Sequence, residues 1–97
     1  MTDRFELRRL SDGLVYHFAR QTRPDMVNGF KRSDGDYWIL YRPGYGWIAW
    51  DDEGQAIAGR PWNVLPDAQS LNAPPEGEWV SKKGAKSYVY DLVHVTP

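Results

Sequence analysis

The side chains that could do acid–base chemistry lie in turns and form no recognisable motif. Asp51, Asp52 and Glu53 are consecutive, and Glu76 and Glu78 flank a single glycine. Two carboxylates that converge can serve as general acid and general base, so a fold that brought two of these groups together could make a small hydrolase. Their spacing names no such pair, and carboxylates in turns are usually hydrated surface groups. We therefore predict no catalytic residue and expect a protein that is not an enzyme.

Motifs for nucleophiles, phosphates and metals are also missing from the sequence. No serine lies in the Gly-x-Ser-x-Gly pattern of a nucleophile elbow, and Gly84–Ser87 shares only its last letters with a phosphate-binding loop. The chain has no cysteine, which excludes disulfides and thiolate metal sites. Asp91 and His94 are an odd number of residues apart, so a strand would place them on opposite faces. We expect no cofactor and no metal.

One hairpin combines aromatic and basic side chains in the way that single-stranded nucleic-acid binders do. The residues concerned are Trp79, Lys82, Lys83, Lys86 and Tyr88. Bases would stack on the rings while the lysines met phosphates. A core Trp–Tyr pair with a solvated lysine tip would produce the same pattern, and the pI of about 6.1 is low for this class of protein. Nucleic-acid binding is therefore kept as an alternative.

Aromatic residues are concentrated between residues 37 and 62, and two of them lie where a core does not reach. Tyr45 stands between two glycines in a turn, and Trp62 follows Pro61 in a proline-rich connection. Exposed Tyr, Trp and Arg are enriched at interface hot spots, and Arg42 and Arg60 are close by in sequence. Our first hypothesis is a non-enzymatic module that binds a partner protein through Arg42, Tyr45, Arg60 and Trp62. Sugar stacking on these rings, or rings that only cap the core, are the alternatives.

Period-two alternation of apolar residues dominates the elements that must position these groups. Strand patterns cover 3–10, 14–19, 30–32, 37–41, 47–50, 55–58, 79–81 and 86–95. Residues 37–41 are apolar on both faces, which predicts a strand covered on both sides. Residues 21–29 and 60–77 read as loops, with at most one short helical turn at 66–71. The pattern predicts an all-β antiparallel meander of about five to seven strands, forming a curled sheet or a small barrel.

Within this pattern, Tyr45–Asp51 followed by Gly54–Ile57 resembles one unit of a WG-type β repeat. The resemblance covers residues 45–57 and occurs once. Such repeats work as arrays, so a single unit implies a β-hairpin and nothing more about function.

Length and charge complete the expectations. The 97 residues suit one domain, residues 1–97, and the net charge of −1 selects no class of partner. Residues 43–78 carry six acidic side chains and one basic side chain. This excess of acidic side chains would give the folded molecule one negative and one positive side, unless folding places the acidic segment among the basic ones. With no membrane span and no apolar signal-peptide core near the first residues, we expect a cytoplasmic protein.

Overall fold

The computed structural model describes residues 3–26, 28–51, 53–83 and 85–95, with the side chain of Lys83 left out. The eight strands are β1 (Arg4–Arg9), β2 (Val15–Thr22), β3 (Asn28–Arg32), β4 (Trp38–Arg42), β5 (Gly46–Asp51), β6 (Ala56–Pro61), β7 (Gly77–Lys83) and β8 (Lys86–His94). The one helical element among the described residues is a 3-10 turn, η1 (Pro66–Ala68), which lies in the segment 66–71 where at most one short helical turn was expected. Among the described residues, no helix has the length and apolar character needed to cross a membrane.

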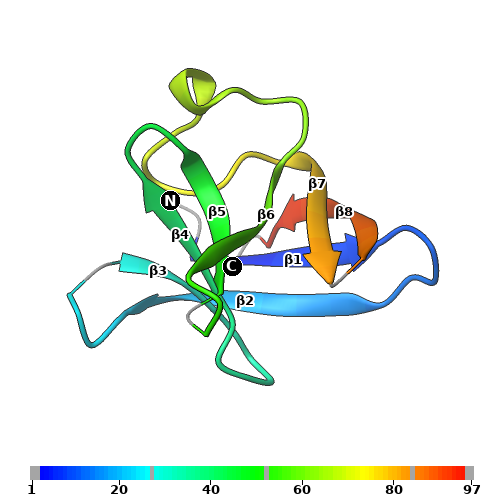
Figure 1. The fold of residues 1–97 in the computed structure, drawn as a ribbon, viewed down its shortest axis with the longest axis horizontal. Helices are drawn as coiled ribbons and strands as arrows, with labels where there is room; N and C mark the ends of the chain where they lie inside the picture. Colours follow the sequence, from blue (N-terminus) through cyan, green and yellow to red (C-terminus); the bar gives the residue numbers. More distant parts are fainter. Residues whose placement is uncertain (1–2, 27, 52, 84, 96–97) are drawn as a thin grey trace.

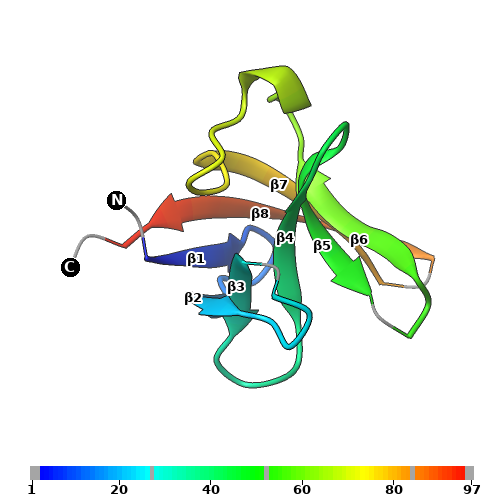
Figure 2. The ribbon, with the colours of Figure 1, turned by 90° about the vertical axis from the view of Figure 1, so that its left-hand side faces the viewer.

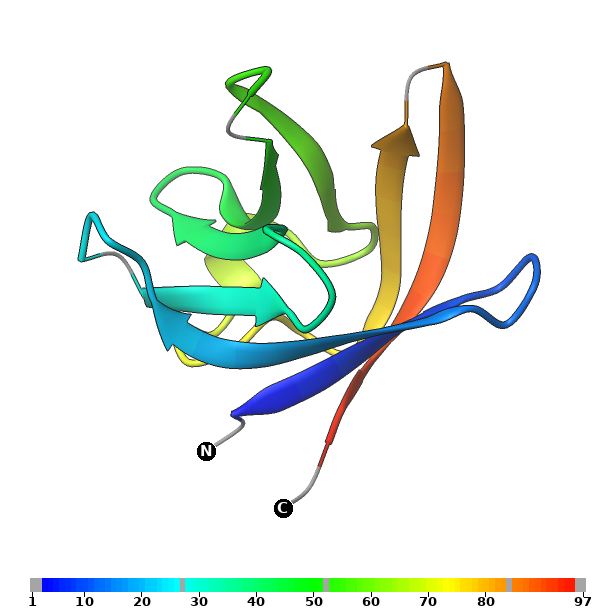
Figure 3. The same ribbon diagram turned by 90° about the horizontal axis from the view of Figure 1, so that it is seen from below.

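The strands form a closed antiparallel barrel in chain order. Each strand pairs with the next, and β8 returns to pair with β1 from Phe5–His94 to Arg9–Tyr90. Figure 3 shows the strands following one another around this barrel. Closure gives every strand two neighbours and so leaves no open sheet edge. The predicted all-β class and small barrel are confirmed, although the strand count is eight rather than five to seven.

The sheet is longer than the pattern predicts, and part of the added length lies in the two segments expected to be loops: 60–77, where β6 reaches Pro61 and β7 begins at Gly77, and 21–29. Gln21 and Thr22 belong to β2, and Asn28 and Gly29 belong to β3. Gly29 pairs with Leu40, and a Cβ built on Gly29 would collide with the Leu40 side chain. The Asn-Gly pair is therefore not a turn here. The glycine is needed because the neighbouring strand's side chain lies over it.

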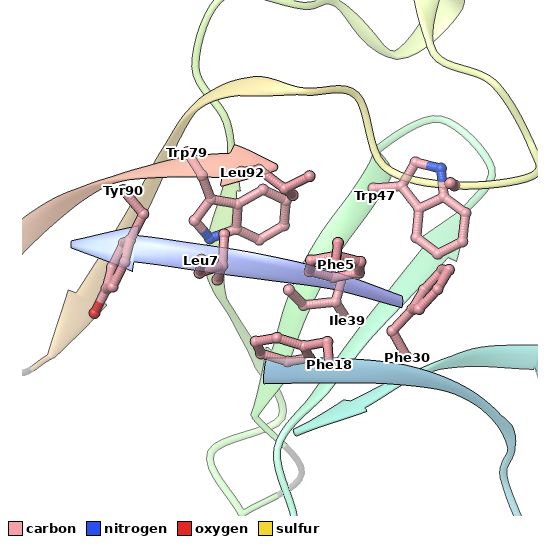
Figure 4. Packing of buried hydrophobic residues seen from close by; sticks show 10 residues of the cluster. Phe5, Leu7, Phe18, Phe30, Ile39, Trp47, Trp79, Tyr90 and Leu92 are labelled. Atoms are coloured by element: carbon pink, nitrogen blue, oxygen red, sulfur yellow. The ribbon is translucent and has the colours of Figure 1, made fainter. Parts of the chain in front are cut away.

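The barrel interior is built from alternate residues of the strands, and rings fill much of it. Figure 4 shows the packing of this buried core and labels Phe5, Leu7, Phe18, Phe30, Ile39, Trp47, Trp79, Tyr90 and Leu92. Phe5 stacks on Phe18 with ring centres 5.0 Å apart and meets Phe30 edge-on at 4.8 Å. Such ring pairs add to the stabilisation that burial alone provides.

One end of the barrel is closed by the connection between β6 and β7, residues 62–76. Figures 1 and 2 show this segment, with η1, arching over the end at which β5 begins. The Trp47 indole Nε1–H donates to the Ser70 carbonyl at 2.7 Å, and the Arg20 guanidinium donates to the Asn72 carbonyl. Within the segment, Ala73 and Pro74 are buried. We call this segment the plug.

The outer side of β4 and β5 is also covered, as the apolar pattern at 37–41 predicts. Trp38, Leu40 and Ile48 point away from the barrel interior and are nevertheless almost wholly buried. The Trp38 ring lies under the Arg23 guanidinium, 5.1 Å from the ring centre, and its indole N–H donates to Asp36. β4 therefore packs on both faces.

Candidate functional site

The residues predicted to bind a partner are carried on the outer side of β4, β5 and β6. Arg42 pairs with Gly46 and Arg60 pairs with Val80, both in positions that point away from the core. Trp62 extends the β6–β7 ladder, since its N–H donates to the Glu78 carbonyl at 2.9 Å. Alternation then sets the Trp62 side chain on the same outer side as that of Arg60. Tyr45 lies in the β4–β5 turn, at the same end of the barrel as Trp62.

This surface combines exposed apolar area with a fixed cation. Tyr45 is 61% exposed and Trp62 is 56% exposed. The Arg42 guanidinium lies over the Trp50 ring, 4.2 Å from its centre. Arg42, Tyr45 and Trp50 line a shallow hollow of about 370 Å³ together with Ile57. We call the set Arg42, Tyr45, Trp50, Ile57, Arg60 and Trp62 the outer aromatic face.

A second candidate site lies at the end of the barrel opposite the plug, and we call it the mouth. It is a cavity of about 750 Å³ lined by residues of the β3–β4 and β5–β6 turns and by side chains of β1, β2, β7 and β8. Phe18 and Trp79 form its floor, and Tyr16 and Tyr88 line its wall. The Trp79 indole N–H donates a hydrogen bond to the Ser81 hydroxyl at 2.9 Å. The rings of the floor are therefore apolar, and the indole N–H already has its acceptor.

Two inward-pointing arginines stand at the mouth. The Arg32 guanidinium lies 4.2 Å from the ring centre of Tyr16 and 3.8 Å from that of Tyr37, and it pairs with Asp34. Arg9 lies 4.9 Å from the ring centre of Tyr88. The ring faces at this end of the barrel therefore already hold two cations.

Arg9 also sets the ionisation of two neighbours. Its guanidinium holds Asp12 through Nε–Oδ1 and Nη2–Oδ2 contacts of 2.9 and 2.6 Å, and these bonds lower the pKa of Asp12 from 3.8 to about 2. Burial raises the pKa of Tyr90, while the hydrogen bond from Arg9 opposes that shift. The Tyr90 hydroxyl accordingly stays protonated at neutral pH.

The mouth was not anticipated from the sequence, yet a signal for it exists. Arg9 follows Phe5 and Leu7 at period two, and Arg32 follows Phe30 in the same way. A charged residue in phase with core positions near a strand end predicts a polar group at the rim of a barrel. The order of the strands and the closure of the barrel decide which turns meet around these arginines. Local sequence patterns do not contain that information.

The basic hairpin is divided by the fold. Trp79 is completely buried, so its ring is not on the surface where a base could stack. Tyr88 is half-buried in the wall of the mouth. Lys82 and Lys86 are exposed, and the side chain of Lys83 lies outside the described residues. The lysines remain available to phosphates, without the indole platform that the sequence suggested.

The carboxylates are distributed over both ends of the barrel. Asp51 and Glu53 line the mouth, Glu76 accepts the His94 N–H at the plug end, and Asp52 lies outside the described residues. Glu78 is exposed on β7. Folding therefore interleaves the acidic segment with the basic ones. Among the residues described, no group of three or more His, Asp or Glu side chains is placed to hold a metal ion.

Comparison with known proteins gives no relative from which a role could be carried over. The β5–β6 hairpin accounts for the resemblance of residues 45–57 to a WG-type unit. No family model matches the chain, and no curated protein or solved structure is significantly similar to it.

Proposed function

We propose that this protein is a non-enzymatic interaction module that binds a partner protein through its outer aromatic face. The observation that carries the proposal is the arrangement of Arg42, Tyr45, Arg60 and Trp62 on one side of the barrel, around exposed apolar area. An apolar patch with polar groups among its rings is typical of protein-binding surfaces. A cytoplasmic location belongs to the same proposal and is supported by the absence of cysteine.

The chemistry of the face favours a partner that offers carboxylates. A guanidinium presents two parallel N–H donors to a carboxylate, which a lysine ammonium does not. Arg42 is held against Trp50, so little side-chain entropy remains to be lost when a carboxylate binds it. Tyr45, Trp62 and Ile57 would supply the apolar contacts around that ion pair.

Site-specific photo-crosslinking tests this proposal. A photoreactive phenylalanine analogue would replace Trp62 or Tyr45, and a control protein would carry it at Val15, on the outer surface of β2. We expect the analogue at position 62 and at position 45 to crosslink to the same partner protein after nuclease treatment. The analogue at position 15 should not crosslink to it.

Arginine variants identify what the partner recognises. Arg42→Ala with Arg60→Ala should lower capture at least roughly tenfold, since each charge-assisted hydrogen bond contributes about 1.5–3 kcal/mol. The Lys variants at the same positions should lie between the wild type and the Ala variants. Equal capture from position 15, or capture unaffected by the Ala variants, would overturn the proposal.

The basic hairpin remains a second candidate because Lys82 and Lys86 are both exposed near the β7–β8 turn, where Lys82 pairs with Ser87 and Lys86 pairs with Lys83. Recovery of nucleic acid that is released by salt would favour this alternative, because phosphate contacts weaken steeply as salt rises. Sugar stacking on Tyr45 and Trp62 stays a prediction. A hydrolase that uses two of the carboxylates also stays a prediction, and Asp51 and Glu53 both line the mouth.

A further inference from the structure

The mouth has the dimensions of a site for a small molecule. Ligand pockets of proteins commonly enclose about 300–1,000 Å³, and the mouth measures about 750 Å³. Phe18 and Trp79 belong to its lining but are almost wholly buried, so the ring surface open to a ligand comes from half-buried Tyr16 and Tyr88 and from exposed Tyr37. The plug lies over the opposite end of the barrel (Figures 1 and 2). A ligand that enters it meets rings on the walls and charged groups only at the rim.

The charges at the rim select the class of ligand. Among the lining residues that the structure describes there are four carboxylates and two cations, those of Arg32 and Lys82. Arg32 is already paired with Asp34. Lys82 is then the one remaining cation against three carboxylates, those of Asp36, Asp51 and Glu53. The field at the opening is therefore negative and attracts cations.

The aromatic walls of the mouth also favour a cationic ligand. Ring faces carry partial negative charge and attract ammonium and guanidinium groups. In the mouth they already do so within the chain, where Arg32 lies against Tyr16 and Tyr37 and Arg9 lies against Tyr88. We propose that the mouth binds a small organic cation with an apolar body, with the body against the half-buried rings of Tyr16 and Tyr88 and the charge among the carboxylates of the rim.

Matched probes test the sign of the charge. Benzyltrimethylammonium, benzyl alcohol and phenylacetate share a benzyl group and carry a positive, zero and negative charge. Titration of each into the full chain, followed by calorimetry and by the NMR signal of the Trp79 indole N–H, should show binding of the cation at millimolar concentrations or below. The alcohol and the anion should bind at least roughly tenfold more weakly, and added salt should weaken only the cation.

Charge variants locate the site. Asp51→Asn with Glu53→Gln should weaken binding of benzyltrimethylammonium roughly tenfold, because each exposed charge pair contributes up to about 1 kcal/mol. Asp67→Asn with Glu78→Gln removes the same two charges from η1 and from β7, away from the cavity lining. This control pair should change the affinity less than twofold.

Ring variants separate stacking from charge. Tyr88→Phe keeps the ring and should keep the affinity, while Tyr88→Leu should lower it several-fold in a barrel whose spectrum remains native. The proposal is overturned if the cation does not bind the folded wild type, if phenylacetate binds as well, or if the control pair has the same effect as the rim pair. None of these outcomes depends on the outer aromatic face, so failure here and failure of partner binding are distinguishable.

Discussion

The backbone N–H of Trp47 donates a hydrogen bond to the Gln69 side chain, 2.8 Å away and 22 residues later in the sequence. The Gln69 side-chain amide in turn donates an Nε2 hydrogen to the Val64 carbonyl at 2.9 Å. One side chain thus joins the start of β5 to two points of the plug. Because Trp47 is almost wholly buried, its N–H would have no water to bond if Gln69 were removed.

Gln69→Ala should therefore lower the free energy of unfolding by about 1–3 kcal/mol, the cost of a buried polar group left without a partner. Urea unfolding monitored by tryptophan fluorescence measures this change. Gln69→Glu keeps an oxygen for the Trp47 N–H and loses only the bond to Val64, so its loss should be smaller. Equal losses in the two variants would mean that the Trp47 bond is not the important one.

Gly46, next to Trp47, makes the close approach of Gln69 possible. Its φ of +77° lies in the left-handed region, and a Cβ there would come within 2.5 Å of the Gln69 Oε1. Gly44 has a φ of +86° and would meet nothing within 4 Å. Both Ala substitutions pay the strain of a left-handed backbone, about 1–2 kcal/mol. Only Gly46→Ala should also displace the plug.

The comparison of Gly46→Ala with Gly44→Ala therefore isolates the contact with Gln69. We expect Gly46→Ala to be the less stable variant by at least about 1 kcal/mol in urea unfolding. In the Gln69→Ala background the collision is absent, so the two glycine variants should cost the same. A difference that persists in that background would contradict this explanation.

Local patterns were sufficient to predict most of the strands. Phe5 and Leu7 alternate with charged residues, and Tyr88, Tyr90 and Leu92 recur at period two in β8. All five side chains point into the barrel as expected. These signals are strong because period-two burial acts on every residue of a half-buried strand.

Closure and the plug could not be predicted in the same way. The pairing of Phe5 with His94 joins opposite ends of the described chain, and no local signal reports it. Residues 62–76 have no periodicity, and their bonds to Trp47 and Arg20 involve backbone carbonyls that any sequence possesses. Local patterns could suggest that Arg42 and Trp62 lie on a surface. They could not reveal the cavity around Arg32, because that cavity depends on barrel closure.

Ser81 supports the floor of the mouth from within the barrel. Its hydroxyl accepts the indole N–H of Trp79, which is wholly buried. Ser81→Ala should cost about 1–3 kcal/mol of unfolding free energy, because the indole N–H then has no acceptor. Ser81→Thr retains the hydroxyl and serves as the control. If Ser81→Ala is as stable as the wild type, the N–H has another acceptor in solution.

The Arg9–Asp12 pair should make stability depend on acidic pH. The pKa of Asp12 is about 2 in the folded chain, against an ordinary 3.8. A carboxyl whose pKa is lowered by folding stabilises the folded state when it is ionised in both states. That stabilisation is complete above the ordinary pKa and is lost as the pH falls from about 4 towards 2.

Asp12→Asn removes the titrating group while keeping a side-chain oxygen for the Leu14 N–H, which now donates to Asp12 Oδ1 at 3.1 Å. The melting temperature of the wild type should exceed that of Asp12→Asn at pH 6, and the difference should shrink steadily between pH 4 and pH 2. Asp67→Asn, with the same change of charge on η1, should show no such convergence. A gap between wild type and Asp12→Asn that is constant down to pH 2 would mean that Arg9 does not hold the carboxylate in its ionised form.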